Sequence, residues 1–97
     1  MADQTTDAED EKILRVGSGS PAPALASAIS HAIYAKQSVL LRAIGAGAVN
    51  QAAKAIAIAG GFVGARGYTL SVRIGFTTLD MEDKTGVTAM TFKVIAG

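Results

Sequence analysis

The chain has 97 residues, enough for one domain, and 49% of them are hydrophobic, enough to fill a core. It contains no cysteine, which excludes disulfides and thiolate metal sites and is compatible with a reducing cytoplasm. Residues 1–12 carry five acids against Lys12 and residues 13–97 carry eight Lys or Arg against three acids. We therefore expect an acidic disordered tail at 1–12, of net charge −4, and a single basic domain at 13–97, of net charge +5.

The first expected elements are a strand at 13–17 and a helix that runs to about Lys36. The turn between them is Gly-Ser-Gly-Ser. Ser20 is a favourable N-cap, and Pro21 suits the first helical position. Apolar residues then recur at helical spacing and predict a core-facing stripe formed by Leu25, Ile29 and Ile33.

A second strand is expected at 38–44 and a second helix at 46–62. Gly45 and Gly47 allow a sharp turn between them. The unpaired N–H groups at the start of such a helix can hold an anion. The alternative is that the glycines only permit tight packing of the strand on the helix.

The expected helix at 46–62 is apolar nearly all round, with few plainly polar positions. Such a helix is buried nearly all round, which a chain of this size cannot easily achieve alone. Residues 43–65 are also too interrupted by glycine to predict a membrane span. One apolar stripe of this helix would face the core. We therefore interpret a second stripe, formed by Ala55, Ile58 and Phe62, as a subunit interface.

Two further strands are expected at 69–79 and 87–95, joined by a polar connection at 80–86. Their residues alternate, which places Leu70, Val72, Ile74 and Phe76 inward. The whole pattern is β-α-β-α-β-β. It predicts an α+β fold in two layers, with both helices on one face of a four-stranded sheet.

The open face of that sheet would collect one cation from each strand. These are Arg15, Arg42, Arg73 and Lys93, which could bind phosphate or simply be solvated. Catalysis is not expected, because the single histidine, His31, has no acid or nucleophile near it in sequence. No metal or cofactor is expected either.

Two runs, 14–21 and 43–63, resemble the signature of the stage V sporulation protein S family, and the similarity covers about Ile13 to Ile95. That family is similar in fold to the Alba nucleic-acid-binding proteins, which are usually dimeric. The resemblance implies a small cytoplasmic regulator that forms dimers and binds DNA or RNA. It also places both glycine turns at one end of the sheet. There a phosphate contact would involve Ser18, Ser20, Asn50, Gln51 and Lys54.

The sequence departs from these patterns at three places. The turn at 17–20 has no lysine, where Alba proteins carry lysines. Gly60 stands where the sporulation family usually has an arginine, and the connection at 80–86 is acidic where Alba hairpins are basic. These departures favour an alternative: a structural or protein-interaction module that self-assembles through the helix at 46–62 and binds no nucleic acid.

Overall fold

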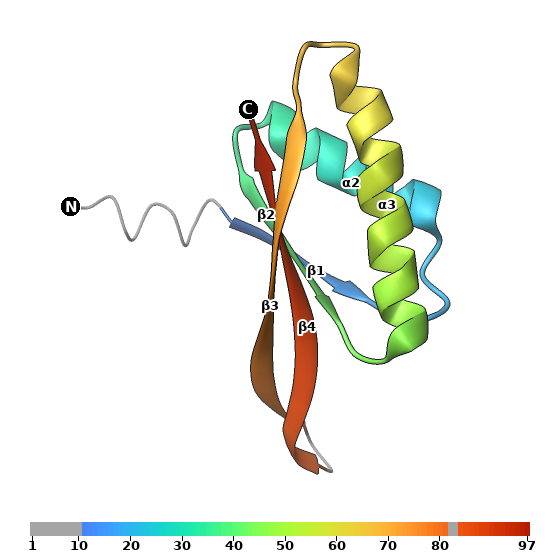
Figure 1. Ribbon diagram of the computed structural model, residues 1–97, viewed down its shortest axis with the longest axis vertical. Coiled ribbons are helices and arrows are strands. Elements are labelled where there is room, and N and C mark those ends of the chain that lie inside the picture. The colour runs from blue at the N-terminus through green and yellow to red at the C-terminus, as the bar shows by residue number, and fades with distance from the viewer. Residues whose placement is uncertain (1–10, 82–83) are drawn as a thin grey trace, which may run out of the picture.

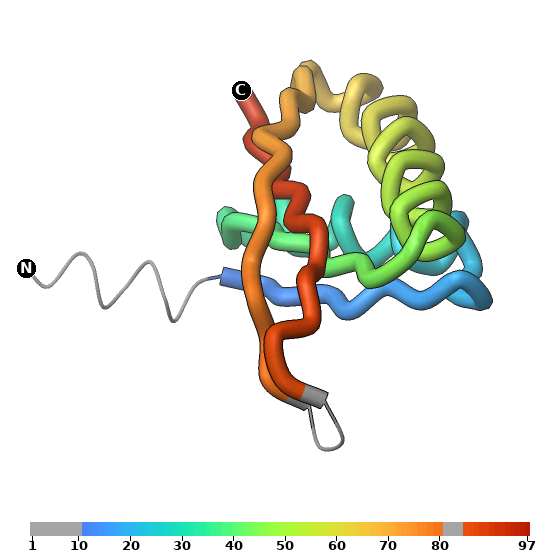
Figure 2. The backbone as a smooth tube through the Cα atoms, turned by 60° about the horizontal axis from the view of Figure 1, so that its bottom comes forward, coloured from blue at the N-terminus to red at the C-terminus, as the bar shows by residue number. Residues whose placement is uncertain are grey.

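Four strands and two helices form two layers in the computed structural model, which describes residues 11–81 and 84–97. The elements are β1 (Glu11–Val16), α2 (Ala22–Tyr34), β2 (Ser38–Ala43), α3 (Ala46–Gly64), β3 (Leu70–Met81) and β4 (Lys84–Ala96). The sheet order is β1-β2-β4-β3, with β1 and β2 parallel and the other pairs antiparallel. Both helices cover the same face of the sheet (Figures 1 and 2). The expected α+β fold is therefore confirmed.

The core lies between the helices and the two central strands. In β2 the burial alternates, and Val39, Leu41 and Ala43 are at most 1% exposed. The register sets Val39 opposite Val94 and Leu41 opposite Phe92, so β4 continues the same apolar face. From α2 the expected stripe is present: Ile29 and Ile33 are buried, and Leu25 packs against the core.

The start of α2 differs from the expectation. Pro21, and not Ser20, is the N-cap residue, and no side chain caps this helix. The hydroxyl of Ser20 instead accepts a hydrogen bond from the Gly17 N–H at 2.9 Å. Ser20 therefore closes the preceding turn. Short hydroxyl side chains are common in such turns as well as at N-caps, because they can bond to nearby backbone groups.

The buried side of α3 is built almost entirely of small residues: Ala48, Ala52, Ala55, Ala59 and Val63. Because Ala55 is 0% exposed, its side chain cannot reach a second subunit, which corrects the expected interface stripe. Ile58 is half-buried and Phe62 is 48% exposed, so these two remain accessible. Of the two described helices, neither is long and apolar enough to cross a membrane.

The hairpin of β3 and β4 is longer than expected and extends past the helices (Figure 1). The register puts Ile74 opposite Phe92 and Phe76 opposite Met90, so both side chains lie on the helix-bearing face, as expected. Nevertheless Ile74 is 59% exposed and Phe76 is 74% exposed. The prediction that they point inward is therefore right about the face of the sheet. It is wrong about burial, because the helices do not cover this part of the edge strand β3.

The folded domain also begins earlier than expected. Glu11 and Lys12 belong to β1, although the sequence assigned them to the acidic tail. The carboxylate of Glu11 forms an ion pair with Nζ of Lys93 at 2.7 Å. The rest of the expected tail, residues 1–10, and the hairpin residues Glu82 and Asp83 lie outside the described part of the chain.

Candidate nucleic-acid interface

The two glycine turns meet at one edge of the sheet. Because β1 and β2 are parallel neighbours, their carboxyl ends lead into the two turns side by side. A Cβ atom on Gly47 would lie 2.8 Å from Cβ of Ser18, closer than real side chains approach. The absence of a side chain at Gly47 therefore lets α3 begin against the first turn, as the packing interpretation of the glycines requires.

A hydrogen bond fastens this contact. Nε2 of Gln51 donates to the backbone carbonyl of Ser20 at 2.8 Å. Nδ2 of Asn50 donates to Oε1, the side-chain amide oxygen, of Gln51 at 3.4 Å. Gln51 and Ser20 are half-buried and hold the turns together, whereas Ser18, Asn50 and Lys54 are exposed. Gly47, Asn50 and Lys54 are three and four residues apart, so they share one side of α3.

Both helices begin at this edge without a side-chain cap. Gly45, the N-cap residue of α3, has a φ of 92°, which a residue with a side chain rarely adopts. Neither helix has an acidic residue in its first turn. The free N–H groups at the start of α3 and the positive ends of the helix dipoles are therefore available to an anion, next to Ser18 and the exposed stripe of α3. The start of α2 offers fewer N–H groups, because Pro21 and Pro23 have none.

Replacing Gly47 by alanine should lower the free energy of unfolding by about 1–2 kcal/mol, because the new Cβ overlaps Ser18. Gly61 in the same helix has no atom within 4 Å of a Cβ, so Gly61→Ala should instead stabilise by up to about 1 kcal/mol. Urea unfolding of both variants checks this. Adding Ser18→Gly to Gly47→Ala should recover stability, and an equal loss in both backgrounds would contradict the contact.

The open face of the sheet is a second basic surface. Arg15 lies opposite Arg42, and Arg73 lies opposite Lys93, so all four expected cations project to this face. Like charges placed directly opposite each other repel, so the pairs Arg15–Arg42 and Arg73–Lys93 are unfavourable by themselves. Lys93 is paired with Glu11, whereas the Nε atom of Arg42 is buried and has no hydrogen-bond partner among the described residues.

The structure thus divides the residues expected at the site into two groups. One edge of the sheet brings together Ser18, Ser20, Asn50, Gln51 and Lys54. Arg42 and Arg73 lie on the open face instead, on strands that β4 separates. The ion pair of Glu11 with Lys93 was missed, because Glu11 is surrounded by other acids in the sequence and β1 was expected to begin after it.

The sequence also matches a known protein family. The family model described as stage V sporulation protein S matches residues 12–97. The match covers all six secondary-structure elements apart from the first residue of β1, and it includes both glycine turns.

Proposed function

Because the chain belongs to the stage V sporulation protein S family, a group of sporulation-related proteins, we propose that it is a small dimeric regulator that binds nucleic acid. The proposed ligand is the phosphate backbone of DNA or RNA, and the proposed compartment is the cytoplasm. The role is one of binding and not of catalysis.

The contact between the two glycine turns carries this proposal. It brings two uncapped helix starts together beside the hydroxyl of Ser18. The exposed side chains of Asn50 and Lys54 follow about one and two turns further along α3. Backbone N–H groups, a helix dipole and a lysine together form a favourable environment for a phosphate. These groups carry no sequence information, so the binding should be independent of base sequence.

Lys54→Glu and Asn50→Asp should each weaken binding of single- or double-stranded DNA or RNA by about tenfold in a gel-shift titration. Lys54→Glu replaces a cation by an anion. Asn50→Asp keeps the shape of the side chain and adds a charge that a helix start tolerates well. Both residues are exposed, so circular dichroism should show an unchanged fold.

Arg73→Glu is the matched control, since it makes the same charge change on the open face. It should weaken binding less than Lys54→Glu does at the same moderate salt concentration. If Arg73→Glu abolishes binding while Lys54→Glu and Asn50→Asp are silent, the open face is the interface. If all three are silent and wild type shows no salt-dependent affinity, nucleic-acid binding is refuted.

The second candidate function is a self-assembling structural or protein-interaction module. The exposure of Ile74 and Phe76, on the face that carries the core elsewhere, favours it. Exposed large apolar side chains are typical of surfaces that meet another protein. The gel-shift series separates the two functions, because a pure assembly module forms oligomers without binding nucleic acid.

A further inference from the structure

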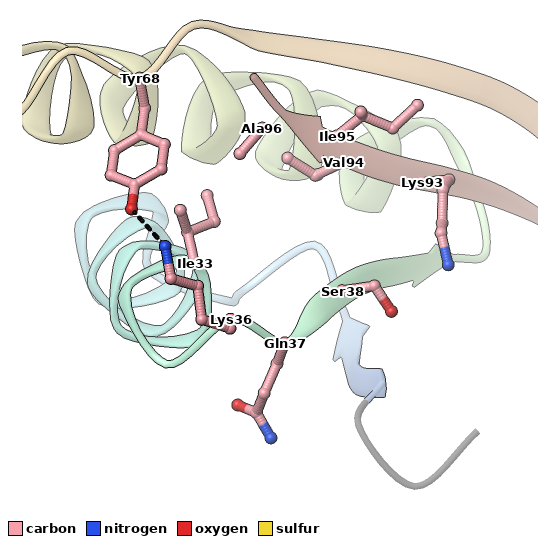
Figure 3. Close-up of a pocket in the computed structure, with 9 residues that line it drawn as sticks. All are labelled: Ile33, Lys36, Gln37, Ser38, Tyr68, Lys93, Val94, Ile95 and Ala96. Atoms are coloured by element: carbon pink, nitrogen blue, oxygen red, sulfur yellow. Dashed lines mark hydrogen bonds between the residues drawn. The ribbon is translucent and has the colours of Figure 1, made fainter. Parts of the chain in front are cut away.

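A pocket of about 410 Å³ opens at the edge of the sheet opposite the glycine turns, where α2 ends, β2 begins and β4 ends. Its floor is apolar, with Ile33 and Val94 only 5% and 4% exposed. Tyr68 and Lys36 stand on one side and the end of β4 on the other (Figure 3). This size lies within the range of small-molecule sites, which combine apolar walls with a few polar groups.

The ring of Tyr68 is held in place by its neighbours. It packs against the ring of Tyr34 with centroids 6.1 Å apart and an angle of 49° between the planes. The guanidinium of Arg66 lies 4.2 Å from the centroid of the Tyr34 ring, a favourable cation–π arrangement. The hydroxyl of Tyr34 in turn faces the Phe62 carbonyl at 3.4 Å. The pocket therefore has a pre-organised aromatic wall.

Lys36 has an unusual backbone. Its φ is +65°, and it is the one residue other than glycine with a positive φ among those described. The N–H groups of Lys36 and Gln37 bond to the carbonyls of Ile33 and Ala32, which ends α2 in a way that glycine normally provides. The helix end explains the backbone conformation but does not require a lysine side chain.

The side chain of Lys36 reaches the rim of the pocket. Its Nζ donates a hydrogen bond to the Tyr68 hydroxyl at 3.2 Å and lies 5.7 Å from the ring centroid (Figure 3). Lys93 also borders the pocket, but its ammonium is held by Glu11. Lys36 has no such carboxylate partner among residues 11–81 and 84–97. Its ammonium is therefore the group that can receive an anion.

We propose that this pocket binds a nucleotide unit, with the base against the ring of Tyr68 and the apolar floor and with the phosphate at the ammonium of Lys36. An aromatic wall accepts any base by stacking, and a lysine binds phosphate as a point charge. The site goes beyond the proposed function, because it lies at the other end of β1 and β2 and uses none of the residues of the glycine turns. A free mononucleotide and a nucleotide within a single strand present the same chemistry.

Two-dimensional NMR of the tyrosine rings tests the proposal. The chain has two tyrosines and no tryptophan, and both tyrosines belong to this cluster. Adenosine 5′-monophosphate should shift their ring signals in a saturable way, and ribose 5-phosphate should bind at least tenfold more weakly. A five-nucleotide single strand, titrated in parallel, shows whether the pocket also accepts a nucleotide within a chain.

Lys36→Gly is the decisive variant. It should weaken binding of adenosine 5′-monophosphate by about tenfold or more. Its thermal midpoint should not fall, since glycine adopts a positive φ without strain. Lys36→Arg keeps the charge and should bind nearly as tightly as wild type. The two tyrosine rings that are followed both belong to this cluster, so phosphate bound at the glycine turns does not enter the measurement and the two sites fail or succeed independently.

Three results would overturn the proposal. Tyrosine signals that stay unshifted with both the mononucleotide and the oligonucleotide would show that the pocket takes no nucleotide. If ribose 5-phosphate binds as tightly as adenosine 5′-monophosphate, the pocket does not recognise the base. If Lys36→Gly binds adenosine 5′-monophosphate as tightly as wild type does, the ammonium group of Lys36 does not bind the phosphate.

Discussion

Leu41→Ala should lower the free energy of unfolding by about 3 kcal/mol, measured by urea unfolding at a fixed protein concentration. Leu41 is fully buried at the centre of the sheet, opposite Leu14 on one side and Phe92 on the other. Truncation leaves a cavity that the flanking strands cannot close. Small domains are stable by only about 5–15 kcal/mol, so the variant should unfold at a clearly lower urea concentration.

Leu40→Ala is the control for this change, because Leu40 is the neighbouring residue and points to the open face. It is half-buried there and should lose less than half as much stability. If both substitutions cost the same, the open face is as buried in solution as the core face. That result would mean that another molecule covers the open face.

Phe76→Asp should convert the proposed dimer into a monomer. Among the residues whose burial the structure describes, Phe76 is the most exposed large hydrophobic residue, at 74%, and Ile74 on the same strand is 59% exposed. In a symmetric dimer each copy loses the same contact, so the effect counts twice. Burial of each phenylalanine is worth about 1.5–3 kcal/mol, and the dissociation constant should therefore rise more than about 100-fold. Light scattering at micromolar concentration measures it.

Ile13→Asp serves as the matched control, since Ile13 is also exposed, at 43%, but lies on the open face. It should leave the dimer intact. Phe62→Asp, in α3, shows whether the interface extends to the helix that the sequence indicated. A wild-type protein that is already monomeric at this concentration would refute the dimer, and an unaffected Phe76→Asp dimer would move the interface elsewhere.

The order of elements and the faces of the strands could be predicted from the sequence, because both depend on local periodicity. The alternation of Val72 and Arg73, for example, assigns each side chain to a face with no knowledge of its neighbours. The stripe of Leu25, Ile29 and Ile33 could be predicted in the same way, because these bulky apolar residues contrast with the small and polar residues around them. The meeting of the two glycine turns followed only from the resemblance.

What could not be predicted depends on tertiary packing. In α3, alanine occurs on every side, so composition did not show that Ala55 faces the core while Ala53 is exposed. For Ile74 and Phe76 the alternation indicates the face but not whether a helix reaches that far along the hairpin. The pocket joins Lys36 to Tyr68, residues that are 32 positions apart and that no local motif connects.

The alanine-lined side of α3 also bears on the entropy of folding. An alanine side chain has no rotamers to lose, whereas a buried leucine or isoleucine loses freedom worth about 0.5–1 kcal/mol. Ala48, Ala52, Ala55 and Ala59 are each at most 1% exposed, and α3 packs along α2. The buried side of α3 therefore gives up contact area per residue but orders very few side-chain torsions when it forms. The ordering cost of this side of α3 falls mainly on the backbone.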